Sequence, residues 1–210
     1  MSINTKIQSL IVDLITGPGG LVYMLLLIFT IVVGILLVCN EVEKGNLVNI
    51  LITNQFRKIV IFTKMFDFIS SITFSNILIY FLTILLFLIS KQSQGVDFVL
   101  ITIHFIGFYL ALLATSSIIF LFSCLFNKII YTFLVNGGIC IFFWITNILS
   151  QAIQSLSWLK YFSLNSLYNT NISALSDVKS FISGLFILLI IFVLLYVSSY
   201  YIFKRKDLLL

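Results

Sequence analysis

The sequence is poor in charge, proline, histidine and cysteine. Charged residues make up 9% of its 210 residues, and it has one proline, one histidine and three cysteines. Soluble domains carry about 25% charged residues, so this composition excludes an ordinary soluble protein. One histidine is too few for the convergent ligands of a protease metal centre, and we expect no metal site. Cys39, Cys124 and Cys140 lack metal-ligand spacing, so we expect them to be small buried residues.

Apolar residues fill the rest of the chain, with 61% hydrophobic residues and a mean hydropathy of +1.20. A membrane-spanning helix needs about 20 mostly apolar residues. Five runs meet this requirement: Gly20 to Cys39, Phe66 to Ile89, Phe98 to Phe126, Ile129 to Leu149 and Phe181 to Phe203. The alternation of a β-barrel is absent, and helices satisfy their own backbone groups in lipid. The sequence therefore predicts an all-α, polytopic membrane bundle, with a transmembrane domain over residues 20–210.

Residues 1–19 lack the basic n-region, apolar h-region and cleavage site of a signal peptide. Ile3, Ile7, Leu10, Ile11 and Leu14 recur at helical spacing between polar residues. This pattern predicts a short helix lying in the membrane interface, ended by the glycines and proline of residues 17–20.

The charge that is present gathers between the first two apolar runs, in residues 40–65, which we call the coupling segment. Its charged residues are Glu41, Glu43, Lys44, Arg57, Lys58 and Lys64. If this segment is cytoplasmic, eight of the 12 basic residues lie inside and four outside, as the positive-inside rule requires. We therefore expect a multi-pass protein of the cell membrane with a cytoplasmic C-terminus. The net charge of +5 then reflects topology, and no nucleic-acid partner is expected.

Within the coupling segment, apolar and polar residues alternate at helical spacing. The apolar face holds Leu47, Ile50 and Leu51, and the polar face Asn46, Asn49 and Thr53. This predicts an amphipathic helix, a break at Asn54-Gln55, and a second short helix from Phe56 that ends before a span beginning at Phe66. Such an element could act as a lever between two spans, and an ordinary loop with snorkelling basic residues is the alternative.

The coupling segment resembles the cytoplasmic segment after the second span in permease subunits of type-2 ABC exporters. That segment reads approximately E-x-E-x-G-T-L-E-x-L-L-x-x-P-x-S-R, followed by G-K. The matching or conservatively substituted positions are Glu41, Glu43, Gly45, Leu47, Ile50, Leu51, Arg57 and Lys64. The chain departs from the pattern at Asn46, Val48, Asn54, Phe56 and Thr63.

Two further pieces are similar to the same family, in the same order. They are the C-terminal run Phe203-Lys204-Arg205-Lys206-Asp207-Leu208 and the loop Ser157-Trp158-Leu159-Lys160-Tyr161-Phe162-Ser163. The resemblance thus covers nearly the whole chain. It implies that the first span here corresponds to the second of the usual six, so that a first span would precede Met1 or this member is shortened.

The resemblance implies a transport subunit, not an enzyme. Such a permease pairs with a second permease copy, as a homodimer or heterodimer, and with a dimer of cytoplasmic ATPase subunits that bind ATP and Mg. No Walker A loop is present in this chain, so we expect no catalytic residue and no cofactor here. Its substrate would be a hydrophobic or amphipathic drug, peptide or lipid, moved out of the cell by alternating access.

The resemblance also implies roles for single residues of the coupling segment. Those expected to couple to the ATPase are Glu41, Glu43, Gly45, Leu47, Arg57 and Lys64. Glu41 and Glu43 would engage basic groups of the ATPase or fix the helix start. Arg57 and Lys64 would anchor the elbow at the membrane face.

Some polar residues fall inside the predicted spans. Asp67, Ser71 and Ser75 share one helical stripe, with Asn76 nearby, and could line a substrate path. Hydrogen bonding between helices is the alternative. His104 has no carboxylate at an adjacent helical position, which favours a hydrogen-bonding role in the bundle over a proton relay.

Other functional classes stay open. An ion-coupled secondary transporter could use Asp67 and the fourth span, which Asn136, Gly137 and Gly138 interrupt, but no matching inverted half is evident. We expect the latter three residues to allow close helix packing. A membrane immunity or anchor protein is a further alternative. The abundance of Ile, Phe, Asn and Lys over Ala, Pro and Arg indicates an AT-rich genome, as in low-GC bacteria.

Overall fold

The structure, a computed structural model, describes residues 15, 20–45, 57–89, 98–153, 155–156, 158–159, 163–167 and 175–205. Its elements are α2 (Leu21–Gly34), the π-helical turn η1 (Ile35–Cys39), α3 (Asn40–Glu43), α5 (Arg57–Ile89), α6 (Phe98–Leu125), α7 (Ile129–Ala152), the 3-10 turn η3 (Leu164–Leu167) and α8 (Leu175–Arg205). Five helical stretches are long and apolar enough to cross a membrane: Leu21–Glu43, Lys58–Ile89, Ile101–Leu125, Ile129–Ser150 and Phe181–Lys204. The prediction of an all-helical chain with five such helices is confirmed for the described residues.

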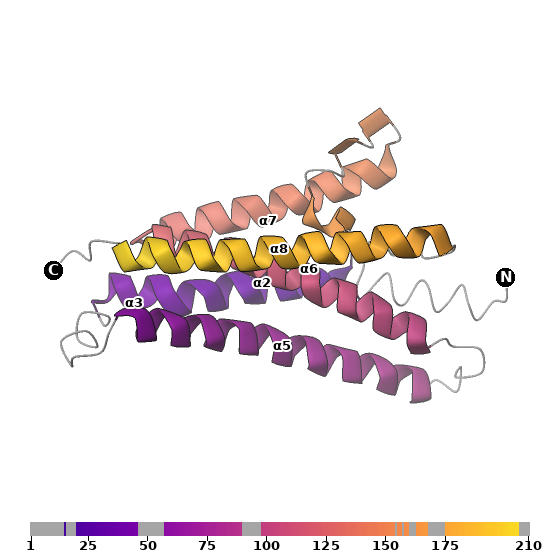
Figure 1. Cartoon of the computed structure of the whole chain (residues 1–210), viewed down its shortest axis with the longest axis horizontal. Coiled ribbons are helices and arrows are strands. Elements are labelled where there is room, and N and C mark those ends of the chain that lie inside the picture. The colour runs from indigo at the N-terminus through magenta and orange to yellow at the C-terminus, as the bar shows by residue number, and fades with distance from the viewer. Residues whose placement is uncertain are drawn as a thin grey trace.

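Successive long helices run in opposite directions along one bundle (Figure 1). The short α6–α7 connection, residues 126–128, makes these two helices antiparallel neighbours. As a result α3, the starts of α5 and α7 and the end of α8 meet at one end of the bundle (Figure 1). We call this the basic end, because the exposed Lys44, Lys58, Lys128 and Lys204 lie there.

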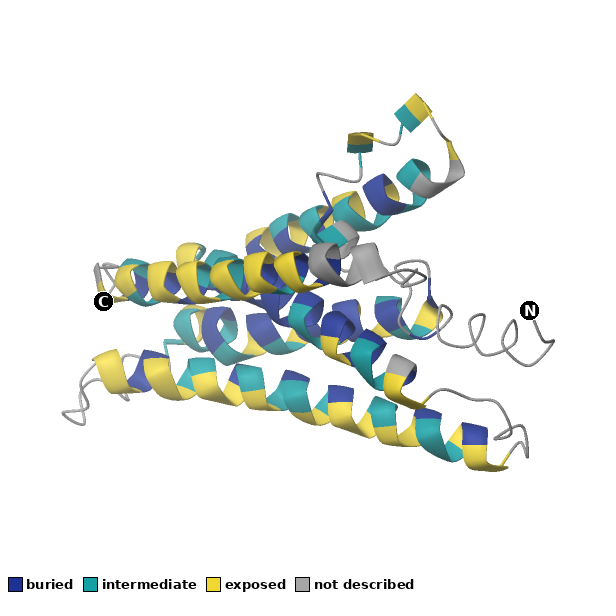
Figure 2. Cartoon of the chain, turned by 45° about the vertical axis from the view of Figure 1, so that its right-hand side comes forward, coloured by how far each residue is buried: buried dark blue, intermediate teal, exposed yellow. Residues whose placement is uncertain are grey.

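Helix α6 is the centre of the bundle. In its most apolar stretch 67% of the residues are buried, against 22% for α5, α7 and α8. It packs most extensively against α8, and it buries Ala111, Ala114, Ser116 and Ser117 completely. Such small residues let neighbouring helices approach closely. Figure 2 shows this buried centre and the exposed outer face of α5.

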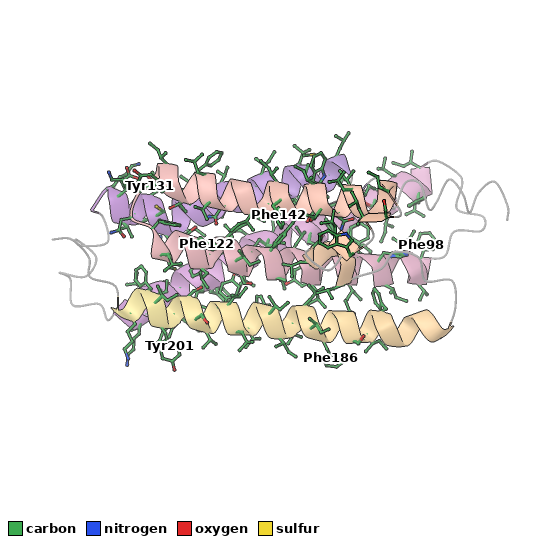
Figure 3. All side chains as sticks on the ribbon, turned by 90° about the horizontal axis from the view of Figure 1, so that it is seen from above. Phe98, Phe122, Tyr131, Phe142, Phe186 and Tyr201 are labelled. Carbon is green, nitrogen blue, oxygen red and sulfur yellow. The ribbon has the colours of Figure 1, made fainter. Side chains whose placement is uncertain are left out.

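The outside of the bundle is covered by large apolar side chains. Figure 3 shows Tyr131 and Tyr201 at one end of the bundle and Phe98 at the other. All three are exposed, and the Lys128 ammonium lies 6.0 Å from the ring centroid of Tyr131. Continuous exposed apolar faces of this kind suit contact with lipid, and aromatic side chains are enriched at both membrane interfaces. The surface is compatible with a multi-pass membrane protein.

Glycine makes two close contacts between elements possible. A Cβ at Gly34 of α2 would lie 2.7 Å from Ile119 Cγ2 and 3.1 Å from Phe68 Cζ, so α2 packs directly on α5 and α6 here. A Cβ at Gly184 of α8 would overlap the carbonyl oxygen of Leu167, which places η3 flat against α8.

One sequence prediction is wrong, and others fall outside the described residues. No separate short helix carries Arg57, Lys58 and Lys64, because α5 is continuous from Arg57 to Ile89. This run contains neither glycine nor proline, so nothing ends the helix before Phe66. The predicted amphipathic helix from Leu47 lies outside the described residues, as does the interfacial helix of residues 1–19, apart from Ile15.

Candidate functional site

The described parts of the coupling segment are residues 40–45, which form α3 and its end, and residues 57–65, which begin α5. The last helical amides are Lys44 N, which donates to Asn40 O at 3.1 Å, and Gly45 N, which donates to Val42 O at 3.1 Å. Gly45 has a φ of 71°, in the left-handed region where a helix commonly ends on glycine. The positive φ at this position therefore explains why this chain has a glycine where the exporter-like pattern has one.

Glu43 caps the start of α7. Its Oε2 accepts a hydrogen bond from the backbone N–H of Ile129 at 2.7 Å. Lys128, the N-cap residue of α7, has an extended backbone, and its side chain makes no capping bond. The first N–H groups of a helix have no partner within the helix, and a carboxylate is favoured there. Glu43 was predicted to engage the ATPase or to fix the helix start in its own segment. In the structure it instead caps the start of a different span, α7.

A second contact joins the same elements one turn deeper in the bundle. Cys39 Sγ lies 3.1 Å from Thr132 Oγ1 and 3.8 Å from the carbonyl oxygen of Phe126. Cys39 and Glu43 are four residues apart, so they share one helix face. The continuous helix α2–η1–α3 is thus attached at two points to the α6–α7 turn and the first turn of α7.

The remaining residues predicted for coupling are placed as follows. Glu41 and Gly45 are half-buried beside Glu43, on α3 and its end. Lys64 is half-buried on α5, and Arg57 is the first residue of that helix, which starts at the same end of the bundle (Figure 1). Leu47 lies outside the described residues. The structure therefore brings two carboxylates, the terminal glycine and the start of α5 to the basic end.

A pocket of about 250 Å³ lies between α5 and α6. Its lining is Thr73, Asn76, Ile77, Tyr80, Thr102, Phe105, Ile106 and Tyr109. Five of these eight side chains carry a hydroxyl or amide group, which is unusual between two helices that face lipid. We call it the α5–α6 pocket.

Of the predicted substrate path, only Asn76 lines this pocket. Asp67 is exposed, and the hydroxyls of Ser71 and Ser75 donate to the carbonyls of Asp67 and Ser71 on their own helix, both at 2.8 Å. The predicted alternative of hydrogen bonds between helices does not describe these two serines either. The pocket stripe Thr73, Asn76 and Tyr80 has the spacing i, i+3, i+7, and this helical spacing was the signal in the sequence that could have found it.

An apolar groove of about 270 Å³ lies between α2 and α7. It is lined by Met24, Leu27, Ile28, Ile31, Phe133, Gly137, Cys140, Ile141 and Trp144. A Cβ at Gly137 or Gly138 would meet nothing within 4 Å, so these glycines do not serve close packing among the described residues. Asn136 does pack, because its buried amide donates to Ile119 O and Ser123 Oγ of α6 at 3.3 and 3.4 Å.

The three cysteines and the histidine lie inside the bundle. Cys39, Cys124 and Cys140 are buried, as predicted, and His104 is buried in α6. Among the described residues, no three His, Cys, Asp or Glu side chains gather where they could hold a metal ion.

No protein-family model, curated protein or solved structure matches the chain. Function is therefore argued from the residues themselves.

Proposed function

We propose that this chain is the transmembrane permease subunit of an ATP-driven ABC exporter in a bacterial cell membrane. It works with a second permease copy and with a dimer of cytoplasmic ABC ATPases, which bind ATP and Mg. By alternating access it moves a hydrophobic or amphipathic drug, peptide or lipid out of the cell. The family resemblance of the coupling segment, the loop 157–163 and the C-terminal run motivates this proposal.

The observation that carries the mechanism is the contact between Glu43 and Ile129. A partner that displaces the coupling segment pushes on α3, and α3 continues without a break into η1 and α2. Because Glu43 and Cys39 also contact the first turn of α7 and its preceding turn, the push reaches two membrane helices together. Such joint movement is what a rigid-body switch between inward-open and outward-open states needs.

The basic end offers contacts for the ATPase. The half-buried carboxylate of Glu41 can receive a basic group of the partner, while Glu43 retains a second oxygen besides the one that accepts from Ile129. By the family resemblance, Arg57, the first residue of α5, and Lys64, further along the same helix, would anchor the other side of the segment at the membrane face.

The second permease copy has an open face available on α7. Gly138 is exposed, and a Cβ there would meet nothing. Glycine at such a position lets a helix of another copy approach closely. The apolar α2–α7 groove beside it, which includes Gly137, extends this face.

Copurification tests the proposal. The tagged chain is isolated from its native cells in mild detergent, and accompanying proteins are identified by mass spectrometry. We expect an ABC ATPase whose hydrolysis rate rises when the chain is present in nanodiscs. E41K/E43K should lower its recovery several-fold, while the control K128Q, at the same end of the bundle, should not.

Two results would count against the exporter, and a third would count against the proposed role of Glu41 and Glu43. Transport in vesicles driven by an ion gradient without ATP favours the secondary transporter. Recovery of a toxin, with no ATPase, favours the immunity protein. An ATPase that copurifies but is unaffected by E41K/E43K overturns the proposed role of the two carboxylates.

A further inference from the structure

The α5–α6 pocket lies toward the end of the bundle opposite the basic end. Phe68 of α5 and Ile119 of α6 both contact Gly34, so these two residues lie at the same height along the bundle. On α5 the pocket residues 73–80 follow Phe68 toward Ile89, at a rise of about 1.5 Å per residue. On α6 the pocket residues 102–109 lie between Phe98 and Ile119. The pocket is thus inside the apolar span, at a distance from the coupling segment.

The hydroxyl protons of the pocket are already used. Thr73 Oγ1 donates its only proton to Ile69 O at 2.8 Å, so the phenol of Tyr109, 2.7 Å away, must donate to Thr73. In the same way Thr102 Oγ1 donates to Phe98 O at 2.8 Å, and Tyr80 donates to Thr102 at 2.9 Å. Both phenol oxygens therefore keep lone pairs that can accept a further hydrogen bond.

The amide of Asn76, unlike the hydroxyl groups, has a hydrogen-bond donor that is not used. Asn76 is 7% exposed, and its amide nitrogen has no acceptor among the described residues. A buried polar group without a partner is costly in an apolar surrounding. The residues that line the pocket thus combine an unused donor on Asn76, just beneath the pocket surface, with unused acceptors on Tyr80 and Tyr109.

The pocket opens to the outside of the bundle and carries no formal charge. Ile77 is 60% exposed and Ile106 is 48% exposed, and both belong to the lining, so they form its rim on the lipid-facing side. Among the described residues, no Lys, Arg, Asp or Glu lines the pocket. An ionised group would enter without a counter-charge, at high desolvation cost.

We propose that the α5–α6 pocket binds the polar group of a neutral amphiphile that enters from the bilayer. The ligand group is a hydroxyl or an amide, because such a group can both accept from Asn76 and donate to Tyr80 or Tyr109. A volume of about 250 Å³ holds about eight water-sized groups, at about 30 Å³ each. The polar group and its neighbouring atoms therefore fit, while the hydrocarbon chain stays in the membrane.

Photolabelling tests the site on the purified full chain in phosphatidylcholine nanodiscs, without any ATPase. The probe is a monoacylglycerol with a diazirine in its acyl chain, competed by unlabelled monoacylglycerol. A fatty acid with the same labelled chain supplies the charged comparison. We expect competable labelling on residues 73–80 and 102–109, with much less from the fatty acid.

Three variants separate binding from folding. N76L and Y109F should each lower competable labelling by about fivefold, as expected for one hydrogen bond. T83V is the control, because Thr83 is buried on α5 and bonds only its own helix, through Ile79 O, outside the pocket. I106W fills the rim without removing a polar group, and it should block labelling even if N76L lowers stability in thermal unfolding.

Several results would overturn the site. The first is labelling that spreads along the exposed apolar faces and is unchanged in N76L and I106W. The second is equal labelling by the fatty acid. The third is no competable labelling, which would leave a pocket that holds only water. The test involves neither ATP nor transport. Its failure therefore leaves the exporter proposal standing, and failure of copurification leaves this site standing.

Discussion

The side chain of Glu43 and the backbone of Ile129 form a 2.7 Å hydrogen bond across 86 positions of sequence. The bond lies where a polar segment leaves one membrane helix and where another membrane helix begins. A helix start without a cap of its own thereby depends on a residue that the exporter-like pattern also contains. The contact makes the coupling segment part of the bundle.

Removing the Glu43 carboxylate should loosen the first turn of α7. Loss of an N-terminal cap costs about 1 kcal/mol, so E43A should speed hydrogen exchange of the Ile129 amide about fivefold. E43Q should fall between E43A and the parent, because it keeps an acceptor oxygen and loses the attraction of charge to the helix dipole. Hydrogen exchange with mass spectrometry measures this in nanodiscs. E41Q is the control, and an equal effect in E41Q would refute the capping role.

Gly45 should tolerate asparagine better than alanine. Its φ of 71° costs most L-residues about 1–2 kcal/mol, whereas asparagine adopts this region more readily. Among the described residues, a Cβ at this position meets nothing within 4 Å, so the cost that they impose is conformational. Thermal unfolding should rank the parent, G45N and G45A in that order. Under the proposed function, ATP-dependent transport in vesicles should fall in the same order, and normal coupling in G45A would exclude the lever.

Gly34 should show a strong interaction with Ile119. G34A places a methyl group 2.7 Å from Ile119 Cγ2, and overpacking of this kind costs about 1–3 kcal/mol. I119A removes that Cγ2 and creates a cavity of its own. The double variant G34A/I119A should be more stable than the sum of the two single changes predicts. Additive effects in a double-mutant cycle of unfolding free energies would mean that the methyl group of G34A does not meet the side chain of Ile119.

Gly184 and Gly138 should respond in opposite ways to alanine. G184A drives a methyl group into the carbonyl of Leu167, so η3 must move off α8. We expect faster proteolytic cleavage within residues 164–167 and lower thermal stability. The methyl group of G138A meets nothing within 4 Å among the described residues, so this variant should leave both unchanged. Equal proteolysis of the two variants would show that η3 does not rest on α8.

The helices were predictable because apolar length alone decides them. The run Phe98 to Phe126 reappears as α6 within one residue, and Ile129 starts α7 as expected. The start of α5 was missed, because a membrane helix can continue beyond the apolar run when no glycine or proline stops it. The apolar composition indicates which residues lie in the membrane, and it does not indicate where a helix begins or ends.

The contacts of the candidate sites were not predictable in the same way. The partner of Glu43 is a backbone amide, which every residue except proline possesses, so no residue type points to Ile129. Gly34 stands in a uniform apolar run, and nothing local shows that another helix crosses there. Tyr80 and Tyr109 lie among phenylalanines, and their pairing with threonines depends on how α5 and α6 cross.

The wide turn η1 sets the direction in which Glu43 points. An α-helix advances about 100° and 1.5 Å per residue. If the same residues Ile35–Cys39 wound as an ordinary α-helix, with none deleted, everything beyond them would rotate by about one residue's step, about 100°. Glu43 would then swing away from Ile129, although every residue around it was unchanged. The π-turn acts as an angular spacer, and the contact between two distant spans depends on a single extra residue in the winding of one helix.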